Sequence, residues 1–277
     1  MIARLETWWF ILKICFAERL VYRGDFALGT LMRFLPIVTQ IFLWGAIFAA
    51  MAGEASGGEV LIRNFTYRDM IAYYLLVFVG RAFSSMPGLA SGVAREVREG
   101  TVKKFLIQPI DMIGFLLLNR IAHKFVYYGV AALPFGFVFW LCRDYFPPTP
   151  DATTIAAFVA SLVMSFLLGF FLEASMGMIS FWFLEVSSLF FVYMLFNFFC
   201  SGHMFPLDFL PSPWQEIVRA TPLQYMAYFP AAVWLGKIQG ADLAWGLAIQ
   251  LAWVVFFIVL CRVLWARGVK RYSGFGG

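Results

Sequence analysis

A charged interruption, AREVREGTVKKFLIQPID at residues 94–111, separates two long apolar stretches of the chain. The protein is 62% hydrophobic and only 13% charged, so a dense group of charged side chains cannot lie among lipid tails. The charged residues of this group are Arg95, Glu96, Arg98, Glu99, Lys103 and Lys104. The stretch must therefore lie in water or against a protein partner, and it marks a loop between two membrane spans.

The spacing within this loop predicts two short helical pieces. Residues of opposite charge recur four positions apart, which places them on one face of a helix. Gly100 can end the first piece and Thr101 can cap the second, which ends at Gln108 before Pro109. Two interpretations stay open on these residues. The stretch is either a solvated loop that satisfies the positive-inside rule or a docking site for another protein.

The composition places the protein in a membrane. Its 277 residues include 33 Phe, 10 Trp and 12 Met, and the mean hydropathy is +0.81. A water-soluble fold of this size exposes much of its chain and could not hide so much apolar surface. The cysteines lie far apart without a CxxC pair, so neither a disulfide framework nor a metal site is indicated. We predict an all-α, polytopic membrane protein with a single domain over residues 1–277.

Apolar stretches of sufficient length predict about six transmembrane helices. They cover approximately residues 26–51, 70–88, 121–141 and 154–181, a fifth span ending near Gly202, and residues 243–264. Residues 1–25 carry an apolar stripe at helical spacing, which predicts an amphipathic helix in the headgroup layer. The stripe comprises Leu5, Trp8, Trp9, Leu12, Phe16 and Leu20. Prolines interrupt residues 201–242, so we predict an extracytoplasmic re-entrant region of short helices there.

The distribution of basic residues determines the predicted orientation. With both termini in the cytoplasm, most basic residues fall on the inner side, as the positive-inside rule requires. The inner ones are Arg4, Lys13, Arg19, Arg23, Arg95, Arg98, Lys103, Lys104, Arg120, Lys124, Arg262, Arg267, Lys270 and Arg271. The outer ones are Arg63, Arg68, Arg143, Arg219 and Lys237. The charged stretch then belongs to a cytoplasmic loop at residues 89–120, and the net charge of +5 reflects orientation rather than nucleic-acid binding.

Polar residues within the predicted spans are candidates for a function inside the membrane. They are Gln40, Arg81, Glu173, Tyr193 and Asn197. An unpaired Arg81 would cost at least about 2.5 kcal/mol, so it either pairs with Glu173 or extends to the inner headgroups. Tyr193 and Asn197 share a face of the fifth span, where they line a path or bond a neighbouring helix. Small residues at every fourth position between Ala157 and Gly177 predict close packing of the fourth span.

Three stretches resemble one protein family. The first runs from Arg98 to Ile110 and contains, in order, a charged pair, Gly-Thr, an apolar residue and Pro-Ile. This order resembles the loop after the second span of ABC-2 type permeases, which are the membrane subunits of one class of ABC exporter. The prolines and glycines at residues 201–236 resemble the re-entrant region before the last span of that family. The tail at residues 268–276 resembles the ending of a subgroup whose permeases work as unlike pairs. The order and spacing of these features extend over nearly the whole chain.

The resemblance implies an exporter subunit in the bacterial plasma (inner) membrane. In that family the loop carries a coupling helix that docks on a separate ATPase subunit, so the six charged residues named above become ATPase-coupling residues. The chain has no G-x-x-x-x-G-K-[ST] motif and does not hydrolyse ATP itself. We therefore expect no catalytic residues and no cofactor on this chain, with ATP and Mg on an ATPase homodimer. Because six spans form half of the membrane part, we also expect a second permease copy, identical or paralogous, and surrounding lipid.

Two other classes of protein are alternatives on the sequence. An intramembrane serine protease would need a base near Ser201, but the adjacent His203 cannot reach it without special backbone geometry, and His123 is predicted at the opposite membrane face. An ion-driven secondary carrier would show inverted repeats and carboxylates near the midplane, whereas Glu173 and Glu185 lie toward the cytoplasmic end. Co-purification with an ATPase subunit distinguishes the exporter from both alternatives.

Overall fold

The computed structural model describes the backbone of residues 2–21, 23–52, 60–108, 110–183 and 185–272, and side chains from residues 6–18, 35–52 and the same ranges beyond residue 60. The described residues are helical and contain no β-sheet, which confirms the predicted all-α class. The chain divides into two compact units. The first comprises Met1–Ile47 and Lys104–Asp144, and the second comprises Phe48–Lys103 and Tyr145–Gly277.

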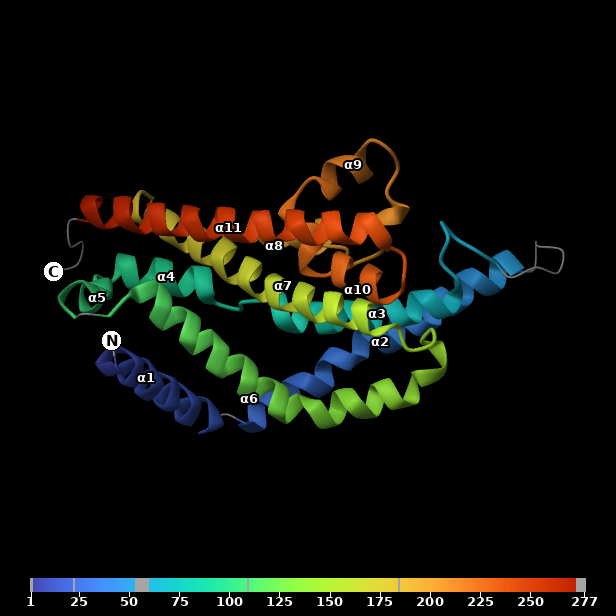
Figure 1. Cartoon of the computed structure of the whole chain (residues 1–277), viewed down its shortest axis with the longest axis horizontal. Coiled ribbons are helices and arrows are strands. Elements are labelled where there is room, and N and C mark those ends of the chain that lie inside the picture. Colours follow the sequence, from blue (N-terminus) through green and yellow to red (C-terminus); the bar gives the residue numbers. More distant parts are fainter. Residues whose placement is uncertain (1, 22, 53–59, 109, 184, 273–277) are drawn as a thin grey trace. The chain divides into compact units, whose positions relative to one another are not determined.

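The helices appear in Figure 1 under the labels used below, with η marking 3₁₀-helices. In chain order they are α1 (Ile2–Val21), α2 (Arg23–Ala52), α3 (Tyr67–Ser84), α4 (Leu89–Arg98), η1 (Thr101–Lys103), α5 (Lys104–Ile107), α6 (Met112–Leu141), η2 (Arg143–Tyr145), α7 (Ala152–Met178), η3 (Ile179–Phe181), α8 (Ser187–Cys200), η4 (Leu207–Phe209), α9 (Trp214–Arg219), η5 (Pro222–Met226), α10 (Tyr228–Trp234) and α11 (Gly240–Arg271).

In the first unit, α1 packs along α6 (Figure 1). The Trp8 ring lies so close to Gly114 that a Cβ atom there would come within 3.0 Å of the ring. Farther along, the Asn119 amide donates to Cys15 Sγ at 3.6 Å. The predicted N-terminal helix is thus confirmed as a helix, although Leu5 and Leu20 of its stripe lie outside the described side chains. Its place in the headgroup layer stays a prediction.

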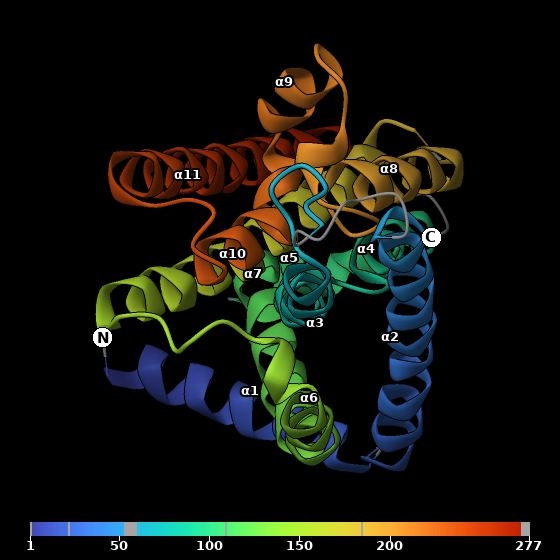
Figure 2. The same cartoon turned by 90° about the vertical axis from the view of Figure 1, so that its right-hand side faces the viewer.

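In the second unit, α7 is the central helix and contacts α3, α4, α10 and α11 (Figures 1 and 2). Its predicted small residues make these contacts possible. A Cβ atom at Gly169 would collide with the carbonyl group of Ser84 at the end of α3. A Cβ atom at Gly177 would lie 2.8 Å from Cβ of Val93 in α4. The predicted close packing of this span is therefore confirmed.

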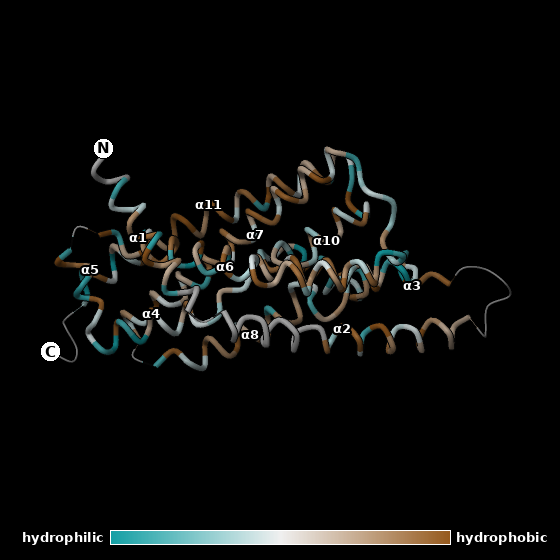
Figure 3. The backbone as a smooth tube through the Cα atoms, turned by 90° about the horizontal axis from the view of Figure 1, so that it is seen from below, coloured by the Kyte–Doolittle hydropathy of each residue, from teal (hydrophilic) through white to brown (hydrophobic). Residues whose placement is uncertain are grey.

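Five helical stretches among the described residues are long and apolar enough to cross a membrane. They are Leu35–Ala52, Tyr67–Arg98, Met112–Leu141, Ala152–Phe181 and Gly240–Arg271. Figure 3 shows long runs of apolar residues, in brown, along α7 and α11, while α4 and α5 carry hydrophilic teal. The predicted fifth span differs from expectation. It is α8, whose 14 residues extend only about 21 Å, less than the hydrocarbon core of about 30 Å.

A tight turn explains why α8 is short. Gly202 has φ +80°, a left-handed conformation that glycine adopts without strain. A Cβ atom there would approach the Tyr228 Cβ to 2.6 Å and the Tyr73 hydroxyl to 2.7 Å. The Tyr73 hydroxyl donates to the Gly202 carbonyl, and Tyr74 donates to the Met204 carbonyl at 2.8 Å. The chain therefore turns after Cys200 and stays bound to α3.

The boundaries of the charged loop are corrected by the structure. Asp111 caps α6 by accepting from the Gly114 N–H at 2.9 Å, so residues 112–120, which we assigned to the loop, are the first turns of a long helix. Gly100 does end the first helical piece, with φ +75°. The Thr101 hydroxyl donates back to the Glu96 carbonyl at 3.3 Å rather than capping η1. Pro109 of the loop motif and the tail beyond Tyr272 lie outside the described residues.

Residues 201–239 contain only short helices, namely η4, α9, η5 and α10, as predicted. Their free backbone groups find polar partners in neighbouring helices. Ser165 of α7 donates to the Tyr225 carbonyl at 2.6 Å. Gln250 of α11, which is fully buried, donates to the same Tyr225 carbonyl at 3.4 Å, and also to the Ser161 carbonyl at 3.0 Å and to Ser165 Oγ at 3.2 Å in α7. Such bonds satisfy the condition that a broken helix must meet at membrane depth. The location of this region on the outer side remains a prediction.

Candidate functional site

The predicted coupling segment is an amphipathic helix seated on α7. On α4, the residues facing the protein recur with helical periodicity and are buried. They are Leu89, Ala90, Val93, Ala94 and Val97. This face contacts α7 and η3, and it approaches Gly177 closely because glycine has no side chain. At this point α4 is therefore in direct contact with α7.

The opposite face of α4 and the adjoining η1 form a charged surface in the second unit. Its exposed members are Arg95, Arg98, Glu99 and Lys103, which together we call the α4 charged surface. Glu96 is half-buried and lies at its edge. The surface mixes basic and acidic groups, so it suits a partner that offers charges of both signs.

The α4 charged surface reaches the turn between η3 and α8. Arg98 Nη1 lies 3.7 Å from Glu185 Oε2, with the two side chains 51% and 67% exposed. A pair so exposed contributes little to stability. Hydrogen bonds from Ser187, including its backbone N–H at 2.8 Å, hold the pKa of the Glu185 carboxyl below its ordinary value. The carboxylate therefore stays charged and available to a partner at neutral pH.

Lys104 is assigned to a different compact unit from the other predicted coupling residues. It begins α5 in the first unit, where its Nζ lies 4.8 Å from the centre of the Phe105 ring. The other five lie on α4, at its C-cap Glu99 and on η1, in the second unit. The α4 charged surface is therefore defined within the second unit, without Lys104.

Three of the predicted intramembrane polar residues lie in one neighbourhood of the second unit. Tyr193 of α8 interacts electrostatically with both Glu173 of α7 and Arg81 of α3. Arg81 also interacts with His203, just beyond α8. Asn197, one turn after Tyr193, has a buried Oδ1 atom without a hydrogen-bond partner among the described residues. Together they form a polar cluster among α3, α7 and α8.

Gln40 belongs to the first unit, where it lies on α2. Its Oε1 accepts from Trp44 Nε1 at 3.1 Å, one turn along the same helix. The structure therefore gives Gln40 a local bond within α2. It does not join Gln40 to the other candidates.

Two polar sites escaped the sequence analysis. Gln250 was visible as a lone amide in the last apolar stretch, yet nothing in the sequence named its partners Ser161 and Ser165. The second site is the bond between Lys237 and Asp69, at 2.8 Å. Its partners are separated by more than half the chain, so only a known fold could pair them.

These features define a multi-pass membrane protein of transport type. Among the described residues, five helices are long and apolar enough to span a membrane, a polar cluster lies among α3, α7 and α8, and no group of three His, Cys, Asp or Glu residues could hold a metal ion. Residues 34–276 match the sequence profile of the ABC-2 family transporter proteins. The chain therefore belongs to the ABC-2 transporter family and is a permease rather than an enzyme. A comparison with curated proteins found no match. The family assignment favours the ABC-2 hypothesis over the ion-driven carrier and the intramembrane protease.

Proposed function

We propose that this chain is the permease subunit of an ABC-2 exporter in the bacterial plasma membrane, with both termini in the cytoplasm. A separate ATPase homodimer, which holds ATP and Mg, binds the cytoplasmic face. A second permease copy, identical or paralogous, completes the membrane part. The observation that carries this proposal is the α4 charged surface, in a chain of the ABC-2 family that has no nucleotide-binding motif of its own.

The packing around α4 supports a mechanical role. Val93 and Ala90 press against Gly177 so closely that α4 cannot move toward α7. At its N-terminal end, α4 follows α3 through a short connection that contains Pro87 and Gly88, the latter with φ +72°. A force applied by the ATPase to α4 would therefore reach both α7 and α3. Tilting of these helices would then alternate access to a path between the two permeases.

We also propose that the polar cluster lies along this path. Arg81 and Glu173 are costly to keep in a bilayer unless polar groups or water surround them. Their placement with Tyr193 provides charge of both signs and a hydroxyl among α3, α7 and α8. This arrangement suits a substrate with a polar part, while the apolar surfaces beside it suit a lipid-like part. The direction of transport in this proposal is outward, as in exporters.

Charge reversal tests the docking role. The variant combines Arg95→Glu, Arg98→Glu and Lys103→Glu, all on exposed side chains that leave the apolar face of α4 intact. We expect the variant still to insert into the membrane. We expect the ATPase either to stop co-purifying with it or to hydrolyse ATP without being stimulated by the permease. Both are measured on the full complex in detergent and in nanodiscs.

A matched control reverses three exposed basic residues of α11. These are Arg267, Lys270 and Arg271. The end of α11 packs on η3, where Gly268 meets the Phe181 ring, so the control lies at the same end of the unit as α4. We expect the control to keep ATPase binding and stimulation. Equal behaviour of the two variants, or full activity of the α4 variant, would remove the α4 charged surface from the mechanism.

A further inference from the structure

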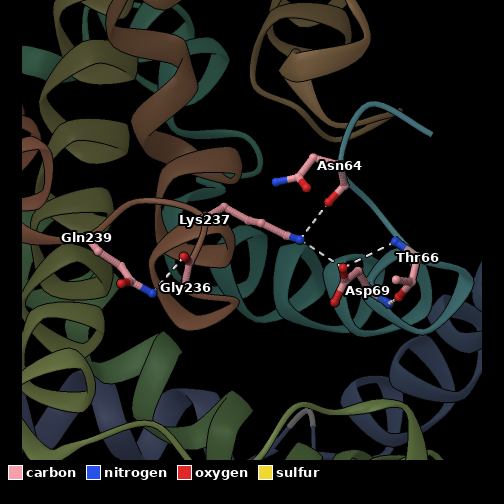
Figure 4. Close-up of polar contacts among 6 residues, drawn as sticks. All are labelled: Asn64, Thr66, Asp69, Gly236, Lys237 and Gln239. Carbon is pink, nitrogen blue, oxygen red and sulfur yellow. Dashed lines mark hydrogen bonds and ion pairs between the residues drawn. The ribbon is translucent and has the colours of Figure 1, made fainter. Parts of the chain in front are cut away.

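A polar network joins the corner between α10 and α11 to the beginning of α3 (Figure 4). Lys237 Nζ donates to Asp69 Oδ2 at 2.8 Å and to the Asn64 carbonyl at 2.8 Å. The same ammonium group lies 4.8 Å from the centre of the Phe65 ring. Lys237 therefore contacts three groups, on Asn64, Phe65 and Asp69, that are separated from it by more than half the length of the chain.

Both partners of this ion pair are fixed by their local backbone. Gly236, with φ +68°, ends α10, and its N–H donates to the Val233 carbonyl at 3.1 Å. The Lys237 N–H donates to the Ala232 carbonyl at 2.9 Å, which completes a helix-terminating motif. On the other side, Asp69 and Thr66 form a capping box at the start of α3. The pair therefore joins two rigid helix ends.

Farther along α3, the contact at Gly80 differs from the ion pair between Lys237 and Asp69. At Gly80, in the inner part of α3, a Cβ atom would come within 3.3 Å of the Ala227 Cα and of the Met226 carbonyl oxygen. This contact is close-packed backbone, and no side-chain ion pair or side-chain hydrogen bond forms it. The Lys237 and Asp69 side chains, in contrast, are 19% and 21% exposed, so water can reach them. A polar bond that water can replace opens more readily than packed backbone.

We propose that Lys237 is a positioning residue of the transport cycle, whose bond to Asp69 fastens the corner between α10 and α11 to the outer end of α3 and opens when the ATPase acts on α4. The inference rests on the proposed function, because the force must enter through α4. The 18 residues of α3 form a rod of about 27 Å between the two ends. A tilt of α3 about the packed contact at Gly80 would separate Asp69 from Lys237.

Distance measurements across the bond test this inference. Spin labels are placed on the exposed positions next to the pair, by Arg68→Cys and Ala241→Cys, in a chain whose Cys15, Cys142, Cys200 and Cys261 are replaced by alanine. The complex with its ATPase is measured without nucleotide and after trapping with ATP and vanadate. We expect the short distance found without nucleotide to be lost in the trapped state. The same distance in both states, in a complex that hydrolyses ATP, would overturn the inference.

Variants separate positioning from simple stabilisation. Lys237→Met should lose the short distance even without nucleotide and make the distance insensitive to trapping. The exchange of both residues, Asp69→Lys with Lys237→Asp, should restore the short distance and its response. The matched control is Arg219→Met, which breaks a 2.6 Å ion pair with Asp208 that lies wholly within the short-helix region. This control should leave the distance and its nucleotide response unchanged.

The outcomes also distinguish this inference from the proposed function. Failure of the ATPase to co-purify with the unmodified chain overturns both. An ATPase that binds and responds to the permease, together with an unchanged distance, overturns only the role of Lys237. Retained co-purification of each variant with the ATPase, and elution as a single species, show that the variant is folded.

Discussion

Replacement of Gly177 by alanine measures how tightly α4 is seated. The added Cβ atom would lie 2.8 Å from the Val93 Cβ and 3.0 Å from the Ala90 carbonyl oxygen. Carbon atoms in favourable contact are about 3.5–4.0 Å apart, so α4 must retreat by roughly 1 Å. Overpacking of this kind costs about 1–3 kcal/mol. The better helix propensity of alanine offsets about 1 kcal/mol of that loss.

Gly129→Ala is the matched control, because it makes the same chemical change without a collision. Gly129 lies in α6, and a Cβ atom there would have no heavy atom within 4 Å. The gain in helix propensity is common to both variants and cancels in their comparison. The free energies of unfolding should therefore differ by about 1–3 kcal/mol, with Gly177→Ala the less stable protein.

Thermal unfolding in detergent provides the assay. Cys15 and Cys261 are buried and not in disulfides, so a thiol-reactive dye reports the unfolding of both units. If α4 receives the ATPase as proposed, we also expect Gly177→Ala to weaken stimulation of ATP hydrolysis, because the shifted α4 would present its charged surface in a different position. If Gly177→Ala unfolds at the same temperature as Gly129→Ala, or above it, the close seating of α4 on α7 is refuted.

Two further changes probe the polar groups of the helix core and of a helix start. Gln250→Leu removes the bonds to Ser161 and Ser165 and should cost about 1–2 kcal/mol in the thiol assay, whereas an unchanged unfolding temperature would show that these bonds contribute nothing. At Asp151, the N-cap of α7, hydrogen bonds led by that from the Thr154 side chain lower the carboxyl pKa. The folded pKa is below the unfolded value of about 4, so the cap stabilises above that pH and its contribution is lost as pH falls through the folded pKa. Between about pH 6 and about pH 3, the unfolding temperature should therefore fall by more for the unmodified protein than for Asp151→Asn. An equal fall in the two proteins would contradict this prediction.

The fold class and most of the helices could be predicted because a segment that crosses lipid must consist mainly of apolar residues. Apolar runs of sufficient length indicated the spans, and the small residues at every fourth position indicated where α7 receives its neighbours. Gly100 marked the end of α4, since a left-handed turn favours glycine. The α4 charged surface was indicated for the same reason as the spans, because charged groups cannot be placed among lipid tails.

Other features depended on contacts that no local pattern records. The shortness of α8 follows from a turn at Gly202 that is held by Tyr73 of a distant helix. Lys104 fell in a different unit from its sequence neighbour Lys103, because the division of the chain depends on which helices pack together. Membership of a compact unit is a property of many contacts and not of a residue's own neighbourhood.

The sequence by itself determined that this protein is a helical, multi-pass membrane protein, and it predicted a charged segment outside the lipid, because hydrophobicity and charge act residue by residue. Only the tertiary structure decided which polar groups meet, such as Gln250 with Ser165 and Lys237 with Asp69. Hydrogen bonds and ion pairs require atoms to come within about 3 Å. For residues far apart along the chain, that proximity is set by the packing of whole helices.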